Sequence, residues 1–114
     1  MLPKTRRLSD DKTIEKTKLS GKVYSNDVAS FIVDSQEKGL DTKFCVVVST
    51  KVSGKAVDRN SLKRKVNLFL ENNLTKFKEG FNIVIIVKRS MLTIKQEDIE
   101  KKLMELSEKA QLLE

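Results

Sequence analysis

Two short apolar runs decide the fold, Phe44-Cys45-Val46-Val47-Val48 and Ile83-Val84-Ile85-Ile86-Val87, with a long amphipathic segment between them. The first run predicts a strand over residues 43–49 that is buried on both faces, and the second a strand over residues 82–88. Between them, residues 57–74 predict a helix, because apolar side chains recur at helical spacing and form a buried stripe: Leu62, Val66, Phe69 and Leu70. The middle of the chain therefore predicts a strand, a helix and a strand.

Flanking segments extend this pattern in both directions. We expect a short helix from Ser9, as its N-cap, to residue 19, then a strand over residues 28–33 and a turn over residues 35–39 with Gly39 at its flexible point. A last helix over residues 95–112 has an acidic outer face and one apolar stripe: Ile99, Leu103, Leu106, Ala110 and Leu113. The order α-β-β-α-β-α predicts an α+β two-layer sandwich, with helices covering one face of a small mixed sheet.

Composition limits the chemistry that this chain can perform. Its 114 residues suit a single domain and include no His and one Cys. Zinc sites, Ser-His and Cys-His nucleophile systems and imidazole bases are therefore excluded, and we expect no catalytic residues in the protein. Cys45 lies inside an apolar run and is expected to be a small buried hydrophobe. The apolar runs are too short to span a bilayer, which favours a soluble cytoplasmic protein.

The net charge of +7 is unevenly distributed along the chain. Residues 1–24, 51–66 and 67–95 carry +4, +5 and +3, whereas residues 25–50 and 96–114 carry −2 and −3. A dense basic segment is typical of a surface that binds a polyanion, although it is also compatible with a solvated face. The segment 51–66 is therefore the first candidate for a nucleic-acid contact.

The predicted central helix separates its charges from its apolar stripe. With Arg59 at zero and about 100° per residue, Lys63 falls near 40°, Asn60 near 100° and Arg64 near 140°. The apolar stripe occupies the adjoining sector, from about 280° to about 20°. Lys65, near 240°, lies apart from the other cations. One helix thus presents a core face and a cationic face.

The run from Ser49 to Lys65, Ser-Thr-Lys-Val-Ser-Gly-Lys-Ala-Val-Asp-Arg-Asn-Ser-Leu-Lys-Arg-Lys, resembles the signature of the bacterial ribonuclease P protein component. The resemblance extends over nearly the whole chain, from Leu2-Pro3-Lys4 and Arg7-Leu8 to the closing acidic helix. This chain departs from the family pattern at five positions: Thr50, Ser61 and Asn67, where Lys or Arg is common, and Ile14 and Lys18, where aromatic residues line a cleft. The chain is identified as a divergent member.

This resemblance implies a fold, partners and a metal. The fold has an unusual left-handed crossover between the last two strands. The implied function is to bind a catalytic RNA and the 5′ leader of precursor tRNA, and so to promote removal of the leader. The RNA and the Mg²⁺ bound mainly to it carry out the hydrolysis. We expect one RNA-binding domain over residues 1–114, with residues 1–8 as a mobile basic tail, and no obligate protein partner.

Candidate RNA contacts follow from the charges together with the resemblance. Arg59, Lys63 and Arg64 are expected to contact phosphates. Asn60 is either an RNA or metal-water contact or a polar residue of the first helical turn, and Asp58 is expected to cap the helix. Further basic candidates are Lys65 on the helix, Lys51 and Lys55 in the loop before it, and Arg6 and Arg7 in the tail. Candidates for the leader cleft are Ile14, Lys18 and Phe31, although residues such as Ile14 and Phe31 more often belong to the core than to a binding platform.

Other functions fit parts of the sequence. A structural RNA-binding protein, such as a ribosomal one, would share the small basic α+β character. A protein-interaction module using the acidic last helix leaves the +5 segment unexplained. A protein nuclease that holds Mg²⁺ through Asp and Glu would need acids near the basic sector, but the acids are concentrated in the last helix.

Overall fold

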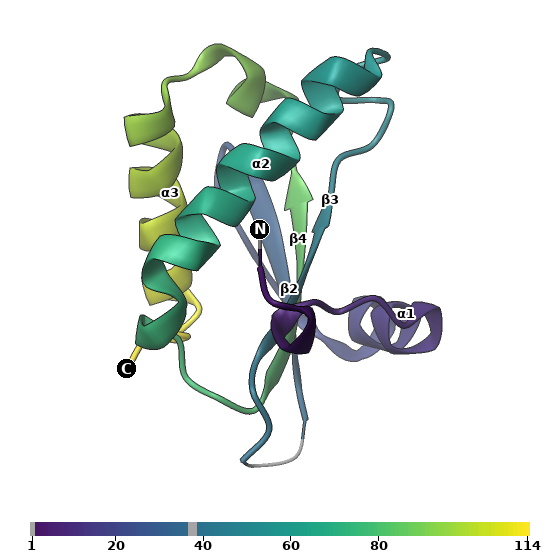
Figure 1. The fold of residues 1–114 in the computed structure, drawn as a ribbon, viewed down its shortest axis with the longest axis vertical. Coiled ribbons are helices and arrows are strands. Elements are labelled where there is room, and N and C mark those ends of the chain that lie inside the picture. The colour runs from purple at the N-terminus through teal and green to yellow at the C-terminus, as the bar shows by residue number, and fades with distance from the viewer. Residues whose placement is uncertain (1, 37–38) are drawn as a thin grey trace.

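The computed structural model describes residues 2–36 and 39–114, which form a four-stranded sheet with α-helices on both of its faces (Figure 1). The elements in chain order, with η for a short 3-10 helix, are η1 (Lys4–Arg6), α1 (Asp11–Ser20), β1 (Lys22–Ser25), β2 (Ala29–Ser35), β3 (Lys43–Val47), α2 (Ala56–Asn73), η2 (Leu74–Lys76), β4 (Phe81–Val87), η3 (Arg89–Thr93) and α3 (Gln96–Lys109). The predicted α+β class is confirmed.

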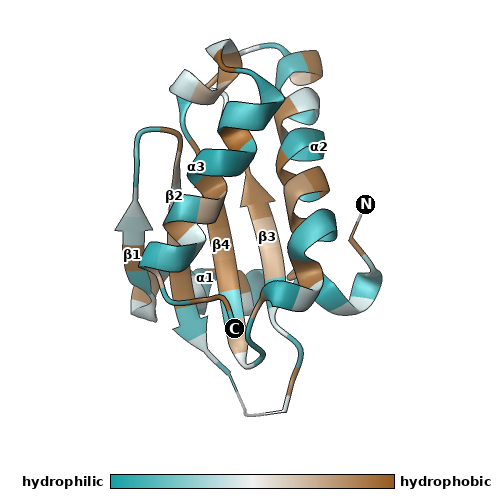
Figure 2. Ribbon diagram, turned by 90° about the vertical axis from the view of Figure 1, so that its left-hand side faces the viewer, coloured by the Kyte–Doolittle hydropathy of each residue, from teal (hydrophilic) through white to brown (hydrophobic). Residues whose placement is uncertain are grey.

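The sheet is mixed, with strand order β1-β2-β4-β3. Strand β4 pairs antiparallel with β2 and parallel with β3. In Figure 2 both parallel strands point upward, α2 lies on the viewer's side of the sheet, and β4 lies to the left of β3. The β3-α2-β4 connection is therefore left-handed, against the general right-handed preference and as the family resemblance implied.

Side chains of the sheet alternate between two apolar layers. Phe31, Ile83 and Ile85 join the main core beneath α2 and α3, together with the predicted stripe Leu62, Val66, Phe69 and Leu70 of α2 and the stripe Ile99, Leu103, Leu106 and Ala110 of α3. Ile32 and Val84 point to the opposite face and form a smaller cluster with Leu8 and Ile14. The period-2 alternation of strands assigns each residue to one layer or the other.

The prediction that all helices cover one face of the sheet is wrong for helix α1. It packs against β2 and β4 on the side opposite α2 and α3, and Figure 1 shows it alone on that side. The thin apolar stripe of this helix, essentially Ile14, could not indicate a face, because either layer of the sheet offers apolar partners. Its N-cap is Asp10 and not Ser9, since the Asp10 carboxylate accepts from the Thr13 backbone N–H at 3.3 Å.

A strand that the sequence analysis missed, β1, makes the order α-β-β-β-α-β-α. Its four residues are polar or exposed, and Val23 leaves 61% of its surface in solvent, so no apolar alternation marks it. Only pairing with β2, in register from Lys22 opposite Val33 to Ser25 opposite Ser30, defines this edge strand.

Strand β3 forms the other edge of the sheet. Cys45, Val46 and Val47 are half-buried, so the predicted burial on both faces is only partial. The chain's start covers part of this edge, because Leu8 N–H donates to the Phe44 carbonyl at 2.8 Å and Leu2 is 2% exposed. Leu2 and Leu8 of the expected basic tail are thus buried, whereas Pro3, Lys4, Thr5 and Arg7 are exposed.

Gly39 lies in the segment between β2 and β3, and its φ of +92° is a left-handed value that favours glycine. The turn expected at residues 35–39 includes residues 37 and 38, which lie outside the described residues. Among the helices of residues 2–36 and 39–114, none is long and apolar enough to cross a membrane.

Candidate nucleic-acid interface

Hydrogen bonds of Ser53 join the loop before helix α2 to the first turn of that helix. The Ser53 hydroxyl donates to the Asp58 carboxylate at 2.9 Å, and the same oxygen accepts from the Lys55 backbone N–H at 3.2 Å. Asp58 is therefore not the N-cap, a position that Lys55 occupies without a side-chain cap bond. The carboxylate instead lies in the first turn, where negative charge suits the positive end of the helix.

Arg59 ties the loop to the helix. Its guanidinium donates to the Ser53 carbonyl at 2.9 Å, and its side chain is half-buried. A guanidinium has five N–H donors, so this bond leaves capacity for an RNA phosphate. Arg59 thus has a structural role in addition to its predicted contact.

Asn60, Lys63 and Arg64 project into solvent from α2. The opposite side of the same helix is buried, with Leu62 and Val66 at most 1% exposed, and Figure 2 shows the alternation of hydrophilic and hydrophobic residues along it. The helical wheel therefore places this group correctly on the outer sector. Exposed amide, ammonium and guanidinium groups on one sector can follow a phosphate backbone.

Lys65 lies apart from this group, as its wheel position indicated. It is half-buried, and its carbonyl accepts from the Gln96 side-chain amide at 3.3 Å, which places it beside the start of α3. Asn67 is also half-buried.

Residues 49–55 form the loop that enters α2. Val52 anchors it, with 6% exposure and a hydrogen bond of 3.1 Å from its N–H to the Ser49 carbonyl. Lys51 and Lys55 are exposed, so both ammonium groups are available beside the cationic sector.

The two tail arginines differ in their surroundings. Arg6 donates from Nε to the Thr42 carbonyl at 2.8 Å and is half-buried, whereas the Arg7 side chain is exposed at the edge of β3. The structure thus brings Arg7 to the α1 side of the molecule and does not join it to the α2 group.

Phe31 does not line a cleft beneath α1, which corrects that prediction. It is fully buried in the core under α2 and α3, and its neighbour Ile32 faces α1 instead. A shift of one residue along a strand moves a side chain to the other face, so a one-residue uncertainty in register was enough to reverse the assignment. Ile14 and Lys18 do lie on α1, half-buried and exposed respectively.

Cys45 lies half-buried on the α1 face of the sheet. Burial raises the pKa of its thiol, while the positive charges of Lys18 and Lys63 act in the opposite sense. Ammonium groups from α1 and α2 therefore both lie within electrostatic reach of the same half-buried thiol. The α1 face of the sheet thus combines the apolar side chains Ile32, Cys45 and Ile86 with two nearby cations, Lys18 of α1 and Lys63 of α2.

Sequence reasoning missed two residues of this region, Ser53 and Ile32. A serine five residues before an acid at a helix start was a usable signal for the first. Nothing local distinguishes Ile32 from Phe31, because the choice depends on pairing with β4.

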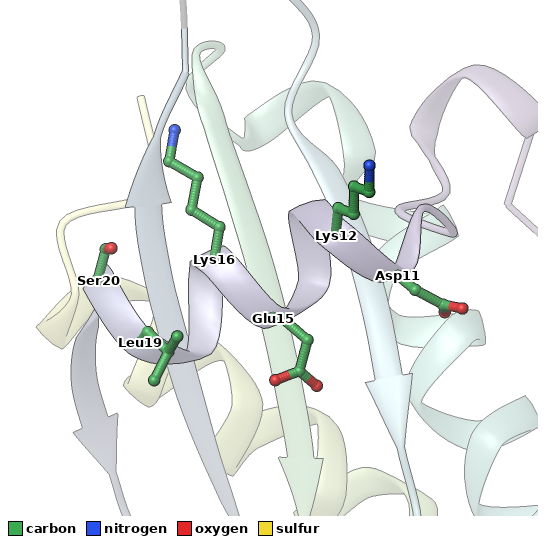
Figure 3. Close-up of a pocket in the computed structure, with 6 residues that line it drawn as sticks. All are labelled: Asp11, Lys12, Glu15, Lys16, Leu19 and Ser20. Carbon is green, nitrogen blue, oxygen red and sulfur yellow. The ribbon is translucent and has the colours of Figure 1, made fainter.

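The hollow in Figure 3 lies elsewhere. Its six lining residues all come from α1, and their side chains diverge into solvent on its outer side: Asp11, Lys12, Glu15, Lys16, Leu19 and Ser20. Leu19 is 84% exposed. No second element closes this hollow among the described residues, so we assign it no role in the candidate interface.

Comparisons with known proteins relate this chain to ribonuclease P proteins. The family model described as Ribonuclease P matches residues 2–111. The ribonuclease P protein component of Finegoldia magna is 32% identical over 109 residues, covering 96% of this chain and 94% of that one. The corresponding protein of a Synechocystis species is 34% identical over 86 residues, covering 75% and 69%.

Solved structures agree in fold. The RNase P protein from Thermotoga maritima superposes with a TM-score of 0.78 at 27% identity and covers 88% of this chain and 93% of its own. The RNase P protein of Staphylococcus aureus gives 0.86 at 19% identity, with 97% and 100% covered.

Proposed function

The chain belongs to the bacterial ribonuclease P protein family, as the protein component of that tRNA-processing holoenzyme, and we propose that it binds the catalytic RNA through α2. The observation that carries this proposal is the exposed group Asn60, Lys63 and Arg64 on a helix whose other side is core. Each cation that neutralises a phosphate releases counterions, which gives a binding energy that depends strongly on salt.

Arg59 and the loop before α2 complete the RNA contact. The bond from Arg59 to Ser53 and the Ser53–Asp58 bond hold the loop against the first helical turn. These bonds keep Lys51 and Lys55 near the cationic sector before RNA binds, so the loop does not have to become ordered on binding. Preorganisation of this kind reduces the entropic cost of association.

The α1 face of the sheet receives the 5′ leader of precursor tRNA in this proposal. Ile14 and Ile86, which are partly exposed beside the buried Ile32, offer apolar contact to bases, and Lys18 and Lys63 neutralise the leader's phosphates. An aliphatic surface supports stacking less well than an aromatic one, so we expect weaker and less base-dependent leader contacts here than aromatic side chains would provide.

Hydrolysis is assigned to the RNA partner. The described residues contain no group of three or more Cys, Asp and Glu side chains placed to hold a metal ion. We propose that Mg²⁺ binds mainly to the RNA. The protein's contribution is to position the substrate and neutralise charge.

The decisive experiment adds the purified protein to the cognate catalytic RNA at low Mg²⁺ and follows cleavage of precursor tRNA. We expect stimulation by the protein, which disappears as salt is raised. Absence of both stimulation and RNA binding would contradict the proposal. Stimulation that is equal for precursors with and without a long leader would contradict only the leader contact.

A further inference from the structure

A polar pocket lies at the end of the sheet where α1 begins. Its lining combines the chain's start, α1 and three strand ends: Arg7, Leu8, Ser9, Asp10, Thr13, Gln36, Lys43 and Asn82. Its volume of about 370 Å³ falls within the range of small-molecule sites. It lies at the first residues of β3 and β4, whereas α2 begins beyond the other end of β3, so it is distinct from the cationic sector.

Asn82 is the unusual residue of this pocket. It is 8% exposed, and within residues 2–36 and 39–114 its side-chain Oδ1 has no hydrogen-bond partner. Leaving a buried polar atom unpaired destabilises the folded state, so such atoms are rare unless a ligand or water pairs with them. A buried amide without a partner at a pocket wall therefore points to a ligand group that pairs with it.

Sheet pairing places charged residues beside this amide. Asp34 and Lys43 are the cross-strand partners of Asn82 on β2 and β3, so the three side chains form a row on the α1 face. Arg7 pairs with Phe44 at the edge of β3, outside this row, and lines the pocket from there. The cations Lys43 and Arg7 thus lie on the β3 side of Asn82, and the Asp34 carboxylate lies on its β2 side.

Asp10 shows that the pocket is not built for a bare anion. Its carboxylate lies in the lining, where hydrogen bonds from the Thr13 hydroxyl and from backbone N–H groups lower its pKa. The ligand must then carry negative charge at the Arg7 and Lys43 side and neutral donors and acceptors at the amide side. A nucleotide has this composition, with a phosphate beside a base edge that pairs well with an amide.

We infer that this pocket binds one nucleotide of single-stranded RNA, with its base at the Asn82 amide and its phosphate at Arg7 and Lys43. The inference rests on the proposed RNA-binding function and adds a second contact point to it. The amide provides base selectivity there that the aliphatic surface cannot.

The test uses the intact protein labelled with ¹⁵N and a set of five-nucleotide RNAs, each of one base, with an abasic backbone of equal length as the control ligand. We expect the Asn82 side-chain amide signals to move with at least one RNA and to stay in place with the abasic backbone. The exposed Asn72 serves as the internal control, and its side-chain signals should not move.

Variants supply an independent readout. Asn82→Leu should lower the affinity of the preferred RNA roughly tenfold and remove the difference between bases. Its melting temperature should equal or exceed that of the parent, because an unpaired buried amide has been replaced by an apolar group. Should this variant fail to fold, the pair Arg7→Ala and Lys43→Ala, which changes no buried amide, should lower affinity for every base equally.

The outcomes separate the two proposals. Asn82 amide signals that stay in place while backbone signals of α2 move would overturn the pocket and leave the RNA-binding function intact. Equal movement with the abasic backbone would overturn base recognition. Absence of movement in both regions would also overturn the pocket, whereas the proposed function is overturned only if the protein neither binds the catalytic RNA nor stimulates cleavage.

Discussion

The guanidinium of Arg59 donates to the backbone carbonyl of Ser53 at 2.9 Å and so fastens the polar loop to the helix that follows it. The Ser53 side chain meanwhile bonds to Asp58, one residue before Arg59. The residue with the strongest sequence argument for RNA contact is therefore also a structural residue. Loss of Arg59 should act on both loop geometry and charge.

Arg59→Ala should lower the free energy of unfolding by about 1 kcal/mol, because it removes a charge-assisted bond to a half-buried carbonyl. Arg64→Ala removes the same charge from an exposed position and should change stability by less than about 0.5 kcal/mol. Urea denaturation of both variants gives the comparison. Equal stability of the two would show that the Ser53 bond contributes nothing.

The double variant Lys63→Ala and Arg64→Ala should bind the catalytic RNA with a weaker salt dependence. The slope of log affinity against log salt should fall by roughly 0.7 to 0.9 for each phosphate that is no longer neutralised. The matched control is Lys76→Ala with Lys101→Ala, two exposed lysines outside the sector, and it should keep the parent slope. An unchanged slope in the folded α2 variant would place the RNA elsewhere.

Ile14→Phe should strengthen binding of the 5′ leader about threefold or more, since an aromatic ring on the α1 face allows a base to stack. The measurement is the ratio of affinities for precursor tRNAs with and without a leader. Phe31→Leu is the control: it alters the core on the opposite face, so it should reduce stability by about 1–3 kcal/mol and leave this ratio unchanged. A changed ratio in the control would contradict the assignment of faces.

Gly21→Ala should destabilise the protein by about 1–3 kcal/mol. A Cβ at Gly21 would lie 2.6 Å from the Thr17 carbonyl oxygen and 2.7 Å from a methyl group of Ile32, at the point where α1 turns into β1. A Cβ at Gly54 would meet nothing within 4 Å, so Gly54→Ala should be tolerated. Thermal melting of both variants is the measurement. A lower melting temperature for Gly21→Ala alone would show that the effect comes from close packing at Gly21, whereas equal losses would contradict this explanation.

Cys45 should make stability decrease at alkaline pH. Burial raises its pKa from the usual 9.0, so the folded state disfavours the thiolate relative to the unfolded chain. The contribution is complete below the unfolded pKa and is lost as pH rises from there through the folded pKa. Urea denaturation at a series of alkaline pH values, with Cys45→Ala as the control, should show a steeper decline for the parent protein.

The elements with strong periodicity could be predicted from the chain alone. The stripe Leu62, Val66, Phe69 and Leu70 and its cationic neighbours follow from about 100° per residue, a local property that every α-helix shares. The three apolar strands could also be recognised locally, because each is a short run rich in apolar and β-branched residues. The basic segment 51–66 could also be recognised from composition alone.

Assignments that depend on pairing between distant segments could not be predicted in this way. Whether Phe31 or Ile32 faces α1 depends on the register of β2 against β4, and β1 exists only as the partner of β2. The Arg7–Lys43–Asn82 pocket gathers residues from three separate parts of the chain. The sequence by itself determined which helix is cationic and which segments are buried, because those follow from local spacing. Only the tertiary structure decided which face of the sheet each side chain reaches, because a one-residue shift in pairing costs little locally yet exchanges the two faces.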